Sequence, residues 1–196
     1  MTENQRLGLF GGSFDPIHLG HLNLAQKAIQ AAHLDRLYFI PTNRNPHKAA
    51  FPQASPEHRL AMLRLAIAGN EHLNIWESEI TAPPPSYTIH TVTLFKNHFP
   101  KAELFWLIGA DNLAQLHRWK AIETLVQQVT FLVLPRSGQP TTPSQPIPNL
   151  RLLSLDTPII DVCATNIREA LIPHQSIEMA LAPAVYAYIQ QNKLYE

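Results

Sequence analysis

Short apolar runs alternate with stretches of helical periodicity along most of this chain. The first run, Leu7 to Phe10, ends in a glycine pair and is followed by Leu19 to Ala32, where apolar residues recur on one helical face. The same reading gives strands at 37–40, 73–76, 104–108 and 131–134, an apolar segment at 150–155, and helices at 58–68, 88–97, 165–171 and 183–191. Alternating elements of this kind build a parallel sheet with helices on both faces. The sequence therefore predicts a doubly wound α/β fold with an open parallel sheet.

Length and composition favour one domain, spanning 1–196. A chain of 196 residues, 45% of them hydrophobic, can bury a sizeable core without dividing into two domains. Two proline-rich segments, 82–85 and 135–149, interrupt the alternation and are predicted to be exposed loops.

Charge and cysteine content exclude several classes of protein. Lys and Arg number 15 and Asp and Glu number 15, so no basic surface for nucleic acid is expected, and no apolar run approaches a membrane span. The single cysteine, Cys163, cannot form an internal disulfide, and the first nine residues lack the basic and apolar regions of a signal peptide. We therefore expect a cytoplasmic protein with no nucleic-acid or membrane partner, and the sequence leaves open whether it forms a homo-oligomer.

Glycines crowd around the end of the first predicted strand. Four of the 7 glycines, namely Gly8, Gly11, Gly12 and Gly20, lie within thirteen residues of each other. A glycine pair here lets the backbone turn with positive φ and approach a ligand, while the next helix offers free N–H groups and a positive dipole end. Phosphate suits this geometry, although a turn that binds nothing would explain the glycines alone.

Two histidines follow the glycine pair. His18 and His21 are spaced i, i+3, so both imidazoles are predicted to project from the first helical turn and to donate hydrogen bonds to a polyphosphate. Such a pair can also ligate zinc, but that alternative requires a third ligand from a distant part of the chain. The segment has neither the Gly-Lys-Ser/Thr of a P-loop nor the glycine spacing of the dinucleotide fingerprint. It predicts a different phosphate-binding device, with no residue assigned to a metal.

The run from Gly11 to His21, Gly-Gly-Ser-Phe-Asp-Pro-Ile-His-Leu-Gly-His, resembles the signature of the bacterial nicotinate-nucleotide adenylyltransferases. These belong to a nucleotidyltransferase superfamily that carries a His-x-Gly-His element and also includes phosphopantetheine adenylyltransferases. The resemblance implies a Rossmann-like nucleotidyltransferase fold and an enzyme that transfers AMP from ATP to nicotinate mononucleotide in NAD biosynthesis, with Mg²⁺ entering on ATP. It also implies catalytic roles for the two histidines and ATP contacts from Gly11, Gly12, Ser13 and Phe14.

Three later segments resemble the parts of this family that hold the acceptor. Asn45-Pro46-His47-Lys48 is similar to its Pro-Pro-His-Lys, which implies a catalytic Lys48 and a substrate contact from His47, although such a pair is otherwise solvated surface. Ser86-Tyr87-Thr88 with Thr91 is similar to the element that binds the nicotinate carboxylate, and the alternative is a helix cap. Trp119 matches the tryptophan that stacks on the nicotinate ring, and the alternative is amphipathic burial.

Two further segments resemble the family's ATP site. Gly109 and Asp111 end a predicted strand, at the edge where open α/β sheets bind ligands, and the carboxylate could accept from ribose hydroxyls. The segment from Cys163 to Arg168 resembles Ser-Ser/Ala-Thr-x-Ile-Arg, which implies that Thr165 and a catalytic Arg168 contact the ATP phosphates. Cys163 replaces the family's serine, and a thiol donates more weakly than a hydroxyl.

The resemblance leaves the acceptor and the activity to be tested. Phosphopantetheine and nicotinamide mononucleotide are alternative acceptors within the same chemistry. A nucleotide sensor without turnover and a zinc-dependent hydrolase are the alternatives from other classes.

Overall fold

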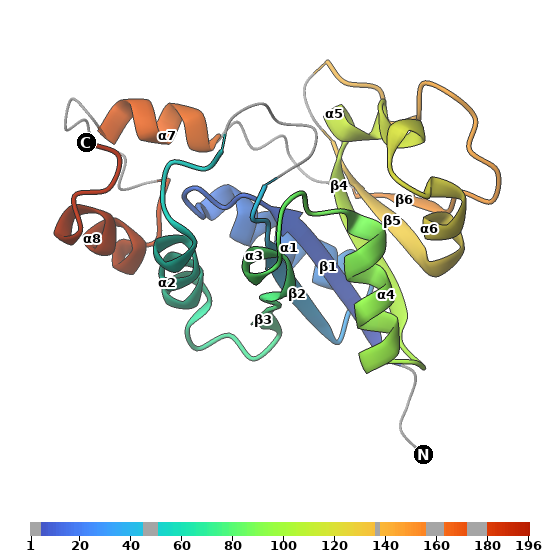
Figure 1. The fold of residues 1–196 in the computed structure, drawn as a ribbon, viewed down its shortest axis with the longest axis horizontal. Helices are drawn as coiled ribbons and strands as arrows, with labels where there is room; N and C mark the ends of the chain where they lie inside the picture. The colour runs from blue at the N-terminus through green and yellow to red at the C-terminus, as the bar shows by residue number, and fades with distance from the viewer. Residues whose placement is uncertain (1–4, 45–50, 136–137, 156–162, 172–179) are drawn as a thin grey trace.

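The computed structural model describes residues 5–44, 51–135, 138–155, 163–171 and 180–196. Its centre is a parallel sheet of six strands in the order β3-β2-β1-β4-β5-β6 (Figure 1). The strands are β1 (Arg6–Gly12), β2 (Arg36–Pro41), β3 (Leu73–Ile75), β4 (Glu103–Gly109), β5 (Val129–Leu134) and β6 (Leu152–Ser154). The chain runs outward from β1 to β3 and then returns to place β4 on the other side of β1, so the strand order reverses there. The doubly wound parallel sheet predicted from the sequence is confirmed.

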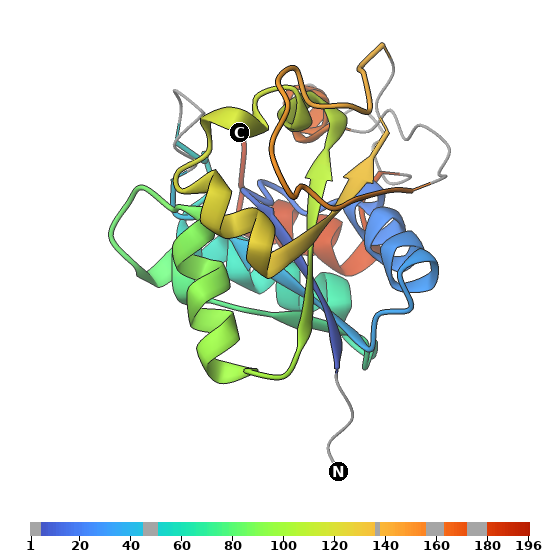
Figure 2. The same ribbon diagram turned by 90° about the vertical axis from the view of Figure 1, so that its right-hand side faces the viewer.

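Helices cover both faces of this sheet. They are α1 (Leu19–Ala31), α2 (Pro56–Ile67), α3 (Ser78–Thr81), α4 (Thr88–His98), α5 (Ala110–Leu113), α6 (Ile122–Gln128), α7 (Ala164–Leu171) and α8 (Pro183–Gln191), with a 3₁₀ turn η1 at Leu116–Arg118. One buried cluster joins a sheet face to α1, α2, α7 and α8, and a second joins the other face to α4, α5 and α6. Figure 2 shows the strands between α1 on one side and α4 and α6 on the other.

Strand side chains alternate between the two clusters, as the pleat of a strand requires. On β1, Phe10 belongs to the cluster beneath α1, whereas Leu7 and Leu9 belong to the cluster beneath α4. Both faces of the central strands are therefore buried, which explains why these strands are continuous apolar runs in the sequence.

The predicted elements are all present, with ends that differ by a few residues. The last helix begins at Pro183, a favourable first helical position, and ends at Gln191 as predicted. The short helices α3, α5 and α6 were not predicted. Residues 82–85 are exposed, and the described residues of 135–149 are exposed or half-buried, as expected of loops.

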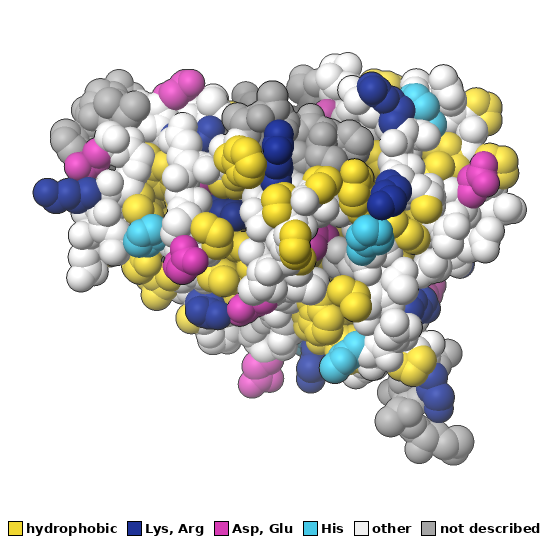
Figure 3. All heavy atoms as spheres, viewed as in Figure 1, with side chains coloured by type: hydrophobic (Ala, Val, Ile, Leu, Met, Phe, Trp, Pro, Cys, Tyr) yellow, Lys and Arg dark blue, Asp and Glu magenta, His cyan; other side chains and the backbone are white. Residues whose placement is uncertain are grey.

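Charges are mixed on the face of the molecule that Figure 3 shows. Positive and negative side chains are interspersed over the face in Figure 3, in keeping with a formal net charge of zero. Of the helices in the described part of the chain, none has both the length and the apolar character needed to cross a membrane.

Candidate active site

The candidate site lies at the carboxyl ends of β1 and β4, the adjacent strands between which the strand order reverses. Open α/β sheets bind ligands at such a switch point. Ser13 follows β1 directly, and Gly109 ends β4 and caps the N-terminus of α5. Asp111 lies exposed in the first turn of α5. The two glycine-containing segments from distant parts of the sequence are thus neighbours in space.

The glycine pair has a different role from the one expected. Gly11 and Gly12 are the last residues of β1 and pair with β2, and the described glycines with positive φ are Gly69 and Gly138. The prediction that Gly11 and Gly12 turn the backbone with positive φ is wrong. A Cβ on Gly11 would lie 2.8 Å from Cζ2 of Trp106, and one on Gly12 would lie 2.9 Å from Cζ of Phe14. Glycine is required here because neighbouring rings occupy the space of a side chain.

The left-handed residue of this turn is Phe14, with φ of 47°. This region disfavours bulky residues and is retained where the surroundings hold it. The Phe14 ring is buried and packs edge-on against Phe10, Phe39 and His21. Its side chain therefore belongs to the core, and any contact of Phe14 with a nucleotide is through its backbone.

The structure brings the two predicted histidines together. His18 is the N-cap of α1, and its ring stacks on that of His21 with a centroid separation of 3.6 Å and an angle of 27°. The backbone N–H of His18 donates to Nδ1 of His21 at 3.3 Å. Because Nδ1 acts as an acceptor, the neutral ring of His21 carries its proton on Nε2. This arrangement fixes both rings at the start of α1, beside the turn after β1.

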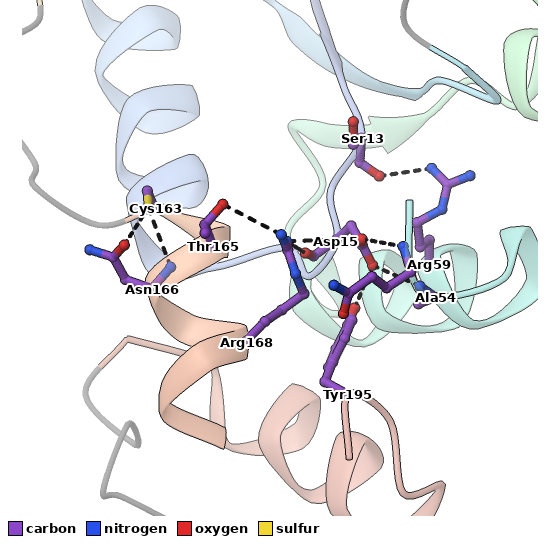
Figure 4. Close-up of polar contacts among 10 residues, drawn as sticks. Ser13, Asp15, Ala54, Arg59, Cys163, Thr165, Asn166, Arg168 and Tyr195 are labelled. Carbon is purple, nitrogen blue, oxygen red and sulfur yellow. Dashed lines mark hydrogen bonds and ion pairs between the residues drawn. The ribbon is translucent and has the colours of Figure 1, made fainter. Parts of the chain in front are cut away.

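Helix α7 brings Arg168 to the same turn from the C-terminal part of the chain. Nη1 of Arg168 donates to the carbonyl of Asp15 at 2.7 Å, and Nη2 donates to Oγ1 of Thr165 at 3.4 Å (Figure 4). The predicted phosphate-binding pair, Thr165 and Arg168, thus lies against the signature segment 153 positions away in sequence.

Cys163 is accommodated as a helix cap. The backbone N–H of Asn166 donates to Sγ of Cys163 at 3.4 Å, and the thiol donates to Oδ1 of Asn166 at 3.1 Å (Figure 4). Serine commonly makes this contact with the third residue of a helix. The thiol that replaces the family's serine therefore caps the first turn of α7.

Three polar residues beneath the turn were not predicted. Asp15 is buried and accepts hydrogen bonds from the backbone N–H groups of Gln53 at 2.7 Å and Ala54 at 3.1 Å, and from the Tyr195 hydroxyl at 2.7 Å. Arg59, on α2, is 1% exposed, and its Nη1 donates to the carbonyls of Ser13 at 2.8 Å and Thr42 at 2.7 Å.

Burial and the charge of Asp15 shift the pKa values of Arg59 and Tyr195. Burial lowers the pKa of Arg59, and the negative charge of Asp15 opposes that change. Burial raises the pKa of Tyr195, and Asp15 raises it further. The sequence signal for this group was Asp15, which lies inside the signature segment. Arg59 gave none because it lies in a predicted amphipathic helix outside any motif, and Tyr195 gave none because no motif surrounds it.

The predicted carboxylate-binding segment opens helix α4. Tyr87 is the N-cap and makes no side-chain cap hydrogen bond, so the alternative of a serine or threonine cap is wrong. The N–H of Ser86 donates to the carbonyl of Arg44 at 3.1 Å. A pocket of about 250 Å³ here is lined by Arg44, Pro84, Pro85 and Tyr87, and Nζ of Lys120 lies 4.2 Å from the centre of the Tyr87 ring. The start of α4, including Thr88, therefore lies beside two cationic side chains.

Two other predicted acceptor residues are less exposed than expected for ligand contacts. Thr91 is 2% exposed, and its hydroxyl donates to the carboxyl of Glu79, itself buried. Burial raises the pKa of Glu79, and the bond from Thr91 opposes that change. Trp119 is half-buried and packs against the second cluster, with its ring centroid 6.3 Å from that of Phe131. The amphipathic burial considered for Trp119 is thus observed.

Two predicted site residues, His47 and Lys48, lie outside the described residues. Within the described ranges, no three His, Cys, Asp or Glu side chains converge as a metal site would require.

Comparisons with protein families and with known proteins indicate the same family. The model of the cytidylyltransferase-like family matches residues 9–170. The nicotinate-nucleotide adenylyltransferase of Bacillus subtilis is 34% identical to this chain and covers 98% of it and 99% of its own length. A protein of Halalkalibacterium halodurans, described as a probable nicotinate-nucleotide adenylyltransferase, is 41% identical and covers 98% of this chain and 92% of its own length.

A solved structure supports the fold. The Plasmodium falciparum nicotinic acid mononucleotide adenylyltransferase complexed with NaAD matches with a TM-score of 0.78 over 98% of both chains, at 18% identity. Because the family model and relatives matched over nearly their full length agree, the chain belongs to the nicotinate-nucleotide adenylyltransferase family of nucleotidyltransferases.

Proposed function

We propose that this chain transfers AMP from ATP to nicotinate mononucleotide, giving nicotinate adenine dinucleotide and pyrophosphate in NAD biosynthesis. The observation that carries the proposal is the meeting of three segments at one sheet edge. The signature segment with His18 and His21, the Gly109–Asp111 segment and the start of α7 with Arg168 converge there, in a chain whose full-length relatives carry this activity in their names.

The reaction is an in-line attack by the 5′-phosphate of the mononucleotide on the α-phosphorus of ATP. The new P–O bond forms as the bond to the pyrophosphate oxygen breaks, and pyrophosphate leaves as an anion. The attacking phosphate is already an anion, so the protein needs no nucleophile of its own. Catalysis rests on positioning and on neutralising charge that builds up on the leaving group.

The charge is neutralised by donors that the fold fixes in advance. Nε2–H of His21 and the His18 ring donate to phosphate oxygens, and Arg168 offers a guanidinium from the other side of the turn. Lys48 is proposed to add a further cation. Asp111 accepts from the ribose hydroxyls of ATP.

Mg²⁺ is proposed to arrive bound to ATP. It would supply positive charge across the phosphate oxygens. The donor set agrees with this route, since the described residues converge on no metal cage and the buried carboxylate of Asp15 is occupied by hydrogen bonds.

The acceptor is proposed to bind at the start of α4. Backbone N–H groups at a helix N-terminus favour a carboxylate, and Arg44 and Lys120 add positive charge beside Tyr87. A carboxylate gains from these charges, whereas the neutral amide of nicotinamide mononucleotide does not. Trp119 would contact the pyridine ring.

An assay of pyrophosphate release tests this proposal directly. Purified protein is given ATP and Mg²⁺ with nicotinate mononucleotide, nicotinamide mononucleotide or phosphopantetheine at equal concentration. We expect strong preference for the first. Preference for another acceptor would overturn the substrate assignment while keeping the chemistry, and the absence of release with all three would favour a nucleotide sensor.

A further inference from the structure

We propose that Tyr195, the penultimate residue of the chain, is a positioning residue for the ATP site: it holds Asp15, and Asp15 holds Arg168. The inference rests on the proposed function only in that Arg168 is taken to contact the ATP phosphates. Tyr195 itself touches no reacting atom and acts from behind the turn.

The contacts form one connected group (Figure 4). The Tyr195 hydroxyl donates to Oδ1 of Asp15 at 2.7 Å, across 180 positions of sequence. The backbone carbonyl of Asp15 accepts from Nη1 of Arg168 at 2.7 Å, and Oδ2 of Asp15 lies 4.0 Å from the same nitrogen. Asp15 thereby joins the end of the chain to α7.

The geometry of Tyr195 indicates that this contact is held firmly. Its backbone has φ of 69°, in the left-handed region that side chains rarely adopt. The residue is half-buried and packs against the cluster beneath α1. Burial and the nearby Asp15 raise the pKa of Tyr195, so the hydroxyl keeps its proton and remains a donor.

Loss of the Tyr195 hydroxyl would remove one hydrogen-bond donor from the Asp15 carboxylate. Oδ1 would keep only the longer bond from Ala54 at 3.1 Å, leaving a buried carboxylate short of one donor. Nη1 of Arg168 already lies 4.0 Å from Oδ2, so its guanidinium needs only a small movement to pair with the carboxylate. A guanidinium drawn into a close ion pair with Asp15 is less available to a phosphate. Tyr195 therefore keeps Arg168 available by donating a hydrogen bond to the Asp15 carboxylate.

The test is the dissociation constant of MgATP for Tyr195→Phe, measured by titration calorimetry with the full-length protein. We expect MgATP to bind about three- to tenfold more weakly, the range that corresponds to one hydrogen bond. The KM for nicotinate mononucleotide should change by less than about twofold, because Tyr195 packs against the cluster beneath α1 whereas α4 belongs to the second cluster.

Tyr188→Phe is the matched control. The Tyr188 hydroxyl lies 2.9 Å from Nδ1 of His58, so this variant also removes one hydrogen-bonded, half-buried hydroxyl from the C-terminal segment. Tyr188→Phe should lower the melting temperature by a similar amount to Tyr195→Phe without weakening the binding of MgATP. In a double-mutant cycle, Asp15→Asn should restore part of the MgATP affinity that Tyr195→Phe loses, since a neutral amide no longer attracts Arg168.

The outcomes separate this inference from the proposed function. An unchanged MgATP affinity for Tyr195→Phe, or an equal loss in Tyr188→Phe, would overturn the positioning role. Parent protein that binds MgATP but releases no pyrophosphate with nicotinate mononucleotide would overturn the proposed function, and the calorimetric comparison would still decide the role of Tyr195. A parent protein without MgATP affinity would refute both.

Discussion

Gly11→Ala tests the steric explanation of the glycine pair. The added Cβ would lie 2.8 Å from Cζ2 and 3.3 Å from Cη2 of Trp106, against 3.4 Å at the lower limit of an ordinary contact. Trp106 is 4% exposed and lies on β4, which pairs with β1. The ring cannot swing into solvent, so the strand end or the core must shift by about half an ångström to admit a methyl group.

The expected cost follows from overpacking. Forcing a methyl into a filled core costs about 1–3 kcal/mol, and the lower chain entropy of unfolded alanine returns about 0.4–1 kcal/mol. The midpoints of these ranges give a net loss of about 1.3 kcal/mol, which corresponds to a fall in melting temperature of roughly 3–5 °C for a chain of this size. The displaced strand end carries Ser13 and Phe14 with it, so the KM for ATP should also rise. Calorimetric melting and initial rates at varied ATP measure the two effects.

Gly8→Ala is the control on the same strand. Its Cβ would lie 2.6 Å from Cδ1 of Leu34, the end of a flexible side chain, and far from the turn. It should leave the KM for ATP unchanged. Trp106→Phe, which shortens the ring, should recover part of the stability lost by Gly11→Ala. Normal stability and ATP affinity in Gly11→Ala, or no recovery in the double variant, would refute the steric explanation.

Three further predictions concern the site. His18→Ala should lower kcat by about 10²- to 10³-fold if the ring stabilises charge in the transition state, and full turnover would remove His18 from the mechanism. Arg44→Met should reduce the kcat/KM preference for nicotinate over nicotinamide mononucleotide by about two- to fivefold, the size of a partly exposed charge interaction; an unchanged ratio would exclude Arg44 from recognition. Because burial raises the pKa of Glu79, its stabilising contribution is complete at acid pH and is lost as the pH rises through that raised pKa. Glu79→Gln stays neutral, so its melting temperature should rise relative to that of the parent as the pH increases above the ordinary pKa of a glutamate, and a constant difference would contradict the shift.

The sheet could be predicted because its strands are buried on both faces. The apolar runs around Leu9, Phe39, Trp106 and Leu132 have little polar interruption, and helical periodicity separates the earlier ones. The short helix α6 offered no such signal. It follows Ala121 in the left-handed conformation, with φ of 52°, and has no side-chain cap hydrogen bond. Tertiary packing of Leu125 and Val126 in the second cluster accounts for it.

The site could be predicted in part because its residues follow strands or open helices. Ser13 and Gly109 lie at strand ends, and His18, Tyr87 and Thr165 lie at helix starts, where turns expose backbone donors to a ligand. The error over Gly11 and Gly12 has a physical origin. The sequence shows that these positions are glycines, but it does not show why. A backbone that needs positive φ and a neighbour that leaves no room for a Cβ both require glycine. The ring of Trp106, 95 positions away, decides between them only once β1 and β4 pair.

The support beneath the site could not be predicted for a related reason. Arg59 shares a helix with apolar residues and Tyr195 lies one residue from the end of the printed sequence, so neither pattern indicates a ligand site. Their hydrogen-bond partners are backbone carbonyls and one carboxylate, and the periodicity of apolar residues in a sequence does not predict such contacts. Asp15 is the exception, because it lies inside the signature between the glycines and the histidines. In the structure its carboxylate is buried and accepts hydrogen bonds from Gln53, Ala54 and Tyr195. The signature thus combines residues proposed to contact the nucleotide with an aspartate that holds the surrounding segments in place. We expect substitutions of the first kind to change kcat and substitutions of the second kind to change MgATP affinity.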